Sequence, residues 1–298
     1  MLDLLFVHWH VDPVLFHIGS LGIRWYSLLF VSGFIIGWYI FRGFFRREGI
    51  SEDLLDPLLY TLLIGTIVGA RLGHCLFYQP DYYLGSWQGF LEIFMPWKGG
   101  LASHGGAIAL LLAMWWYARH YGRKNDFDFL WIMDHLCITV AFAGCLIRLG
   151  NLFNSEIYGD VTSLPWGFRF IDNVGAFMHG AEPIFTVPCH PTQLYEATCY
   201  LVTFAVCMWL YWKRNAQERE GLILGVFMLG IFGSRFLVEY VKNVQVEWEI
   251  AMRSTWGVDQ GQLLSIPFIL LGLWLVIRAM RRPRVPINFP NKFADDKK

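Results

Sequence analysis

The sequence predicts an all-α integral membrane protein with about seven transmembrane helices, because its composition and the lengths of its apolar segments agree. Of its 298 residues, 55% are hydrophobic and only 16% are charged, whereas a soluble domain usually carries about 25% charged residues. Tryptophan (14 residues) and phenylalanine (25 residues) are abundant, as expected where aromatic rings line the two bilayer interfaces.

Seven apolar stretches account for the predicted helices. Each has close to the roughly 20 residues that a helix needs to cross a bilayer. Helices are favoured because a backbone in lipid must satisfy its own hydrogen bonds, and the stretches lack the polar–apolar alternation of barrel strands. They cover residues 23–41, 57–77, 99–118, 127–149, 193–212, 221–241 and 263–280.

Lysine and arginine indicate the orientation of these helices. With the N-terminus outside, sixteen Lys and Arg residues fall in the cytoplasmic loops and tail, and three fall outside. The positive-inside rule therefore predicts an N-terminus outside and a C-terminus in the cytoplasm. The three outer residues are Arg169, Lys242 and Arg253.

The chain is predicted to form a single transmembrane domain, residues 1–280, followed by a polar cytoplasmic tail, residues 281–298. The longest loop, about residues 152–192, contains four prolines and lies outside in this orientation. Because long loops in compact proteins are often functional, we expect a small folded extracytoplasmic cap there.

Three arginines lie at a similar depth in the predicted helices. Arg71, Arg148 and Arg235 fall in the last third of the second, fourth and sixth stretches, all of which run from inside to outside. His104, near the start of the third stretch, and Tyr26, at the start of the first, are expected on the same side. Charge at membrane depth is costly, so each such residue is a functional hypothesis.

Further polar side chains share these helix faces. Glu239 follows Arg235 by four residues and Asn151 follows Arg148 by three, spacings that bring side chains together on one face of a helix; Glu156 comes shortly after. These groups are either paired charges that fix helix packing or a binding site. Arginine forks suit phosphate, so the second interpretation favours an anionic lipid headgroup or an anionic solute near the outer leaflet.

Other candidate residues support simpler interpretations. The six cysteines show no CxxC spacing, and five lie in apolar stretches as expected for small buried side chains. His8 and His10 have no further ligand at metal spacing, and Asp134 with His135 is interpreted as a local polar contact. The sequence therefore implies neither a metal nor a soluble cofactor, and no nucleic-acid partner.

Three motifs occur together in this sequence. Residues 148–159 read RLGNLFNSEIYG, residues 99–106 read GGLASHGG, and residues 190–196 read HPTQLYE. They resemble motifs of bacterial prolipoprotein diacylglyceryl transferases, in which the first is the family signature. The match extends from residues 12–14 (DPV) and 25–26 (WY) to residues 261–267 (GQLLSIP). It covers nearly the whole chain in order, and the combination is specific.

The sequence departs from the family pattern at four positions. Ile147 stands where glycine is usual and Leu152 where phenylalanine is usual, and both changes concern packing. Lys98 replaces a common acidic residue and Lys242 an arginine, so both bear on the charge near the expected site.

The resemblance implies a reaction at the bacterial inner membrane. A diacylglyceryl group moves from phosphatidylglycerol to the lipobox cysteine thiol of a preprolipoprotein, which forms a thioether and releases glycerol-1-phosphate. This is the first step of lipoprotein maturation. The expected partners are thus phosphatidylglycerol, lipobox segments and membrane lipids, and the active site is expected to face the outer leaflet.

Roles for individual residues follow from this resemblance. Arg148 and Arg235 are expected to hold the phosphate, and His104 is the candidate base for the thiol, with an arginine-assisted thiolate as the competing idea. Glu156, Glu239, Asn151 and Tyr26 complete the expected catalytic set. The remaining expected substrate-binding residues are Arg71, Asn154, Gly159 and Tyr195.

A transporter for an anionic solute is the rival from another class. It predicts a polar route through the inner half of the membrane and broken helices in two related halves. The sequence shows no such repeat, and Asp134 with His135 is the only strong polar pair in the inner half. A purely structural scaffold leaves the clustered arginines unexplained.

Overall fold

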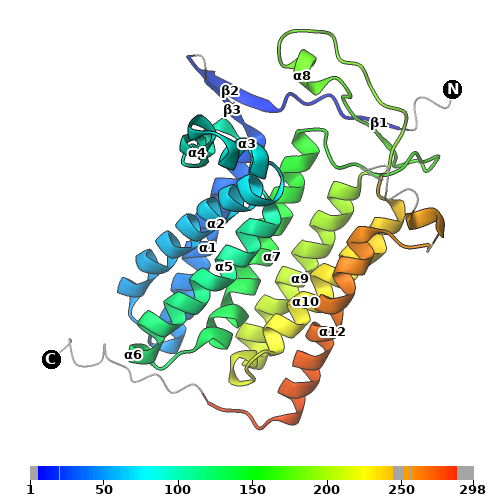
Figure 1. Ribbon diagram of the computed structural model, residues 1–298. Coiled ribbons are helices and arrows are strands. Elements are labelled where there is room, and N and C mark those ends of the chain that lie inside the picture. Colours follow the sequence, from blue (N-terminus) through cyan, green and yellow to red (C-terminus); the bar gives the residue numbers. More distant parts are fainter. Residues whose placement is uncertain (1–5, 20, 244–251, 256, 287–298) are drawn as a thin grey trace. The chain divides into compact units, whose positions relative to one another are not determined.

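The computed structural model describes residues 6–19, 21–243, 252–255 and 257–286, and this part of the chain is mostly helical (Figure 1). The α-helices are α1 (Trp25–Glu48), α2 (Leu55–Phe77), α3 (Pro80–Gly85), α4 (Trp87–Ile93), α5 (Ser103–Tyr117), α6 (Arg123–Asn125), α7 (Phe129–Phe153), α8 (Val174–Phe177), α9 (Thr192–Arg214), α10 (Leu222–Val238) and α12 (Gln260–Arg281). The strands are β1 (Val7–His8), β2 (Val14–Ile18), β3 (Leu21–Arg24) and β4 (Phe168–Arg169).

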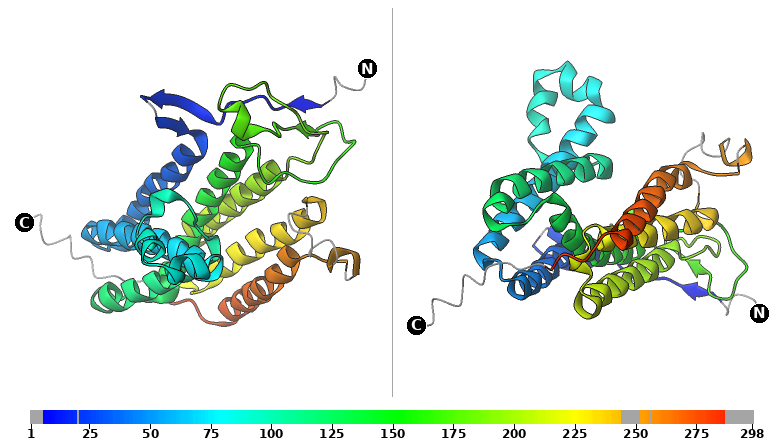
Figure 2. Two further views of the ribbon diagram at one scale, coloured as in Figure 1. Left: turned by 45° about the horizontal axis from the view of Figure 1, so that its top comes forward. Right: turned by 90° about the horizontal axis from the view of Figure 1, so that it is seen from below.

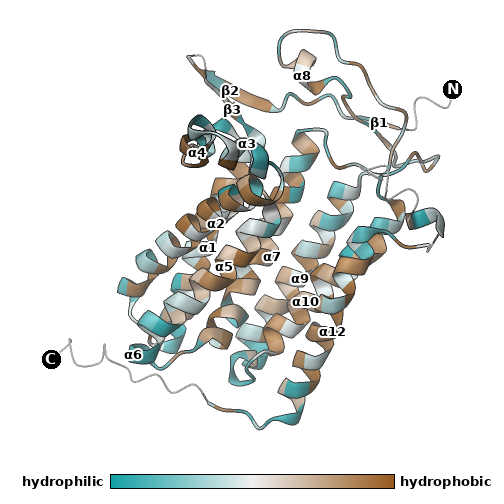
Figure 3. Ribbon diagram, viewed as in Figure 1, coloured by the Kyte–Doolittle hydropathy of each residue, from teal (hydrophilic) through white to brown (hydrophobic). Residues whose placement is uncertain are grey.

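Six helices of the described chain are long and apolar enough to cross a membrane, so this is a multi-pass membrane protein. Their middles are apolar and their ends carry most of the hydrophilic residues (Figure 3). They are Trp25–Glu48, Glu52–Phe77, Phe129–Phe153, Thr192–Arg214, Leu222–Val241 and Gln260–Arg281.

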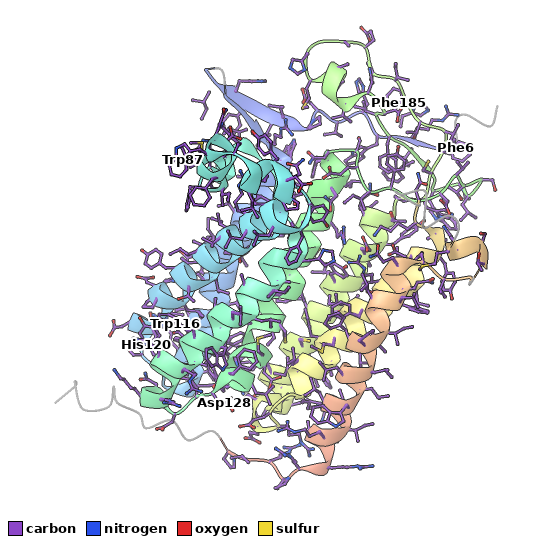
Figure 4. The ribbon with its side chains drawn as sticks, viewed as in Figure 1. Phe6, Trp87, Trp116, His120, Asp128 and Phe185 are labelled. Atoms are coloured by element: carbon purple, nitrogen blue, oxygen red, sulfur yellow. The ribbon has the colours of Figure 1, made fainter. Side chains whose placement is uncertain are left out.

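The predicted stretch at residues 99–118 differs from the other six. Its helix, α5, begins only at Ser103 and has 15 residues. Gly99 and Gly100 have φ angles of 87° and 73°, a left-handed conformation that cannot belong to a right-handed helix. At its other end α5 continues into a π-helical turn, Ala118–Gly122, and then α6. Trp116 and His120, labelled in Figure 4, stack there at 5.1 Å between ring centroids.

The described residues group into two compact units. One contains residues up to Gly37 and those from Asp134 to Pro286, and the other contains Trp38–Met133. The chain passes between them within α1 and within α7. The predicted tail beyond Pro286 lies outside the described residues.

In the unit formed by Trp38–Met133, α2 and α5 approach each other through small residues. A Cβ atom added at Gly73 would lie 2.7 Å from the Cα of Gly105. One added at Gly65 would lie 2.9 Å from the Cβ of Ala113. Small residues let helix backbones pack closely in membranes. A segment of short helices, α3 and α4, continues from the end of α2 (Figure 2) and carries Trp87, labelled in Figure 4.

In the other unit, α9, α10 and α12 lie side by side (Figures 1 and 2). The Gly225–Gly272 contact brings α10 and α12 together, since a Cβ at Gly225 would lie 2.9 Å from the carbonyl oxygen of Gly272. The carboxylate of Asp134 accepts hydrogen bonds from the backbone N–H groups of Gly221 (2.6 Å) and Leu224 (2.7 Å) at the start of α10. The sequence predicted a local polar contact for Asp134 and His135, whereas the Asp134 carboxylate binds backbone groups of a helix far along the chain.

The loop predicted as a cap contains β4, α8 and several isolated β-bridges. Strand β4 pairs in parallel with β1, and Phe168 forms a further bridge with Cys189. The indole of Trp9 donates to the carbonyl oxygen of Leu152 at 2.9 Å, which ties the N-terminal segment to the end of α7. Burial raises the pKa of the Cys189 thiol, so this cysteine stays protonated at neutral pH.

Candidate active site

The C-terminal end of α7 supplies the first group of site residues. Arg148 and Asn151 lie three residues apart on one helix face, and the guanidinium donates to the amide oxygen of Asn151 at 3.3 Å. The Nε atom of Arg148 lies 2.9 Å from a carboxylate oxygen of Glu196, on α9, whose side chain is fully buried. The Tyr200 ring lies 6.0 Å from the Arg148 Cζ atom. The expected contact between Arg148 and Asn151 is thus present, and a buried carboxylate joins it.

The turn after α7 brings Glu156 back beside Asn151. Ser155 and Ile157 have φ angles of 51° and 59°, so the chain reverses sharply here. One carboxylate oxygen of Glu156 then accepts hydrogen bonds from the side-chain amides of Asn151 (2.8 Å) and Asn154 (3.1 Å). The Glu156 carbonyl oxygen accepts from Gln193 Nε2 at 2.6 Å. This segment of the predicted motif therefore forms one hydrogen-bonded unit.

A second pair of charges reaches Glu196 from the end of α10. The Lys242 ammonium lies 3.9 Å from Glu196 and 3.5 Å from Glu239, so it bridges the two carboxylates. Arg235 lies one turn before Glu239, but no carboxylate of the described chain lies within 4.0 Å of its guanidinium. Within the described residues Glu239 is therefore paired with Lys242, and Arg235 forms no ion pair with a carboxylate there.

The charges of this cluster balance. Arg148, Arg235 and Lys242 are cationic, and Glu156, Glu196 and Glu239 are carboxylates. The cluster therefore offers an anion directed N–H donors rather than a large net charge, and the geometry of these donors matters most.

Tyr26 packs against α7 at Gly150. A Cβ atom at Gly150 would lie 2.8 Å from the Tyr26 ring, so glycine is needed for this approach. The ring is thereby placed between the levels of Arg148 and Asn151 on α7. The structure thus brings Tyr26, at the start of α1, to the motif that contains Arg148, Asn151 and Glu156.

Gly159 and Tyr195 contact the segments that surround the cluster. Gly159 forms a β-bridge with Lys242, and its N–H donates to the His190 carbonyl oxygen at 2.8 Å. The Tyr195 hydroxyl accepts from the Trp166 indole at 2.9 Å and lies 3.3 Å from His190 Nδ1. Gly159 therefore links the start of α9 to the segment that carries Lys242, while Tyr195 belongs to a separate polar network.

His104 and Arg71 lie in the other compact unit. His104 is exposed in the first turn of α5. Arg71, on α2, is only 3% exposed, and its guanidinium donates to backbone carbonyl oxygens. Binding of substrate by Arg71 stays a prediction.

The match to a sequence model decides the family. Residues 13–278 match the model of prolipoprotein diacylglyceryl transferases, which is nearly the whole chain and includes every residue of the cluster.

The chain belongs to the prolipoprotein diacylglyceryl transferase family.

Similar proteins from several bacteria support the assignment to prolipoprotein diacylglyceryl transferases. A protein of Porphyromonas gingivalis is 50% identical over 280 residues, which cover 93% of this chain and 96% of that protein. Proteins of Tolumonas auensis (40% identical, 90% of this chain and 96% of that protein) and Chloroherpeton thalassium (36% identical, 94% and 97%) are also similar. All three are named phosphatidylglycerol–prolipoprotein diacylglyceryl transferase.

Glu196 is the site residue that sequence reasoning missed in this prolipoprotein diacylglyceryl transferase. It ends the HPTQLYE motif and lies four residues into α9, in a stretch predicted to be membrane-embedded. An acidic side chain at membrane depth is itself a functional signal. Tyr195, beside it, was selected instead, and the partner on α7 that gives Glu196 its importance is visible only in the folded chain.

We expect Glu196→Gln to destabilise the protein strongly. The substitution leaves the guanidinium of Arg148 buried without its counter-charge, and removal of one partner of a buried pair costs about 3–5 kcal/mol. The control is Glu218→Gln, because Glu218 lies 4.0 Å from Arg284 in a partly exposed pair, where a loss of less than about 1 kcal/mol is expected. Thermal unfolding of the purified variants measures the difference, and equal shifts in both would contradict the importance of the buried pair.

Proposed function

We propose that this protein transfers the diacylglyceryl group of phosphatidylglycerol to the lipobox cysteine thiol of preprolipoproteins, the first step of lipoprotein maturation. The observation that carries the proposal is the match, over nine-tenths of the chain, to relatives named for this activity. In the reaction the thiol sulfur forms a bond to the glyceryl carbon. The bond from that carbon to the phosphate oxygen breaks, glycerol-1-phosphate leaves, and the thiol proton passes to a base.

Arg148 and Arg235 are the proposed phosphate ligands. Both guanidiniums come from helices of the same compact unit, and Arg235 makes no ion pair within the described residues that would occupy its fork. A planar guanidinium can bind two phosphate oxygens at once. Because the leaving group gains negative charge as the carbon–oxygen bond breaks, donors fixed at this position stabilise the transition state.

The polar neighbours of the arginines orient the headgroup. One carboxylate oxygen of Glu156 accepts hydrogen bonds from the side-chain amides of Asn151 and Asn154. The other oxygen can accept a hydrogen bond from a glycerol hydroxyl. Tyr26 presents its hydroxyl beside this group. Glu239 holds Lys242, while Gly159 and Tyr195 shape the surrounding segments.

His104 is the proposed base. A thiol attacks as its thiolate, and His104 is exposed at the start of α5, as a residue that accepts a proton from an incoming peptide must be. A thiolate stabilised by an arginine is the competing route. No cofactor enters this reaction.

The proposal includes a topology. Seven segments, with α5 as the shortest, would cross the bacterial inner membrane, with the N-terminus and the cap of residues 152–192 outside and the tail in the cytoplasm. The active site would then face the outer leaflet. We expect an impermeant thiol reagent to label a cysteine introduced at exposed Val187 in intact cells and not one introduced at Arg284. The opposite labelling pattern would reverse the orientation.

Direct transfer tests the proposed activity. Purified protein is incubated with phosphatidylglycerol and a lipobox peptide, and mass spectrometry follows the peptide. We expect the mass increase of one diacylglyceryl group, and none with a peptide whose cysteine is replaced by serine or with phosphatidylethanolamine as the lipid. Absence of the product with phosphatidylglycerol, from a folded protein, would refute the proposed activity.

Arg148→Lys and Arg235→Lys are each expected to lose most transfer activity although the charge is kept, because lysine lacks the planar fork. We expect a loss on the order of 10²-fold, the scale seen when one donor to a developing anion is removed. Arg214→Lys, at the far end of α9 and over the Trp209 ring, is the matched control. Full activity in both site variants would exclude bidentate phosphate binding, and loss of folded protein would indicate a structural role.

A further inference from the structure

Arg71 binds a single segment of backbone. Its Nε atom donates to the carbonyl oxygen of Ile93 (3.2 Å) and one Nη atom to those of Gly99 and Gly100 (3.2 Å for Gly100). The other Nη atom donates to the carbonyl oxygen of Glu92. The Tyr83 ring lies 4.9 Å from the Cζ atom. Four of the five N–H donors of an arginine are thus used by carbonyl oxygens between residues 92 and 100.

These carbonyl groups need such a donor. Glu92 and Ile93 end α4, where helix carbonyl oxygens lack the usual partners and attract a cation; the Glu92 oxygen also accepts from the Met95 N–H at 3.0 Å. Gly99 and Gly100 have positive φ angles, so their carbonyl groups belong to no helix. Since unpaired carbonyl groups are costly away from water, the buried guanidinium of Arg71 stabilises both the end of α4 and the backbone at Gly99 and Gly100.

The same segment leads directly into the helix that carries His104. The Ala102 N–H donates to the Ala70 carbonyl oxygen at 2.8 Å, beside Arg71. A Cβ atom at Gly100 would lie 2.5 Å from the His74 ring and 3.0 Å from an Arg71 nitrogen. The segment therefore lies directly against α2, and α5 begins one residue after its last contact.

We propose that Arg71 is a positioning residue that fixes His104 by holding residues 92–100 against α2, and that it does not bind the phosphate. Arg71 is 3% exposed and has one N–H donor left. Its guanidinium therefore lacks the two free donors that bidentate binding of an anion requires. The link to catalysis rests on the proposed function of His104. The hydrogen bonds by which Arg71 holds residues 92–100 do not depend on that function.

Arg71→Lys tests the proposal in the full-length protein in phosphatidylglycerol-containing nanodiscs. A lysine ammonium has three donors on a flexible stem and cannot reach all four carbonyl oxygens. We expect kcat to fall by about 10²-fold, the effect of a displacement near 1 Å in a reacting group, with the KM for phosphatidylglycerol within about twofold. Hydrogen exchange of residues 94–106 should become at least about tenfold faster, and that of residues 148–160 should stay unchanged.

One further variant and two controls separate the backbone contacts from other effects. Glu92→Gln removes the ion pair with Lys98 (2.9 Å) but keeps the carbonyl oxygen that Arg71 binds, so we expect wild-type kcat and exchange. Gly100→Ala disturbs the same contacts from the other side and should reproduce the Arg71→Lys effects. Gly85→Ala, where a Cβ meets nothing within 4 Å, controls for the change of residue type. Gly100→Ala carries the test if Arg71→Lys is not recovered folded.

The outcomes distinguish this proposal from the proposed function. An increase in KM with unchanged kcat and exchange would show that Arg71 binds the lipid, and faster exchange with unchanged kcat would break the link to His104; either overturns the proposal. If the wild-type protein shows no transfer, the proposed function fails, and the exchange data alone then decide whether Arg71 holds the segment.

Discussion

The buried ion pair between Arg148 and Glu196 sets the arrangement of the candidate site. It joins the end of α7 to the beginning of α9, and the Glu196 side chain is fully buried while that of Arg148 is largely so. Because Glu196 also faces Lys242, the end of α10 is drawn to the same point. Three helices thus meet at one carboxylate, and the hydrogen-bonded turn around Glu156 is built on the first of them.

A different constraint governs the unit that carries His104. There, glycine and alanine on α2 and α5 allow close backbone contact, and the cation Arg71 binds carbonyl groups instead of carboxylates. Arg148 and Arg71 are therefore used in two ways. Arg148 pairs with a buried carboxylate, and Arg71 completes the hydrogen bonding of an irregular backbone.

Local spacing predicted the helices and the short-range parts of the site. Six of the seven apolar stretches form helices long enough to span a membrane, and the Arg148–Asn151 contact follows from their spacing of three residues. The late start of α5 was not predicted, because apolar composition does not show that Gly99 and Gly100 adopt positive φ angles. The partners of Glu196 were missed for a related reason, because they depend on how α7, α9 and the end of α10 pack. Glu239 pairs locally with Lys242, three residues after it, although Arg235, four residues before it, lies on the same helix face.

The Asp134 carboxylate at the start of α10 has a consequence for assembly. The first N–H groups of a helix have no partner within it, and in lipid each unpaired group costs several kcal/mol. Here the partners of the Gly221 and Leu224 N–H groups come from α7, which leaves the ribosome well before α10. When α10 is synthesised, the Asp134 carboxylate that accepts its first N–H groups is therefore already present on α7. The order of synthesis thus places the hydrogen-bond acceptor before the donors that need it.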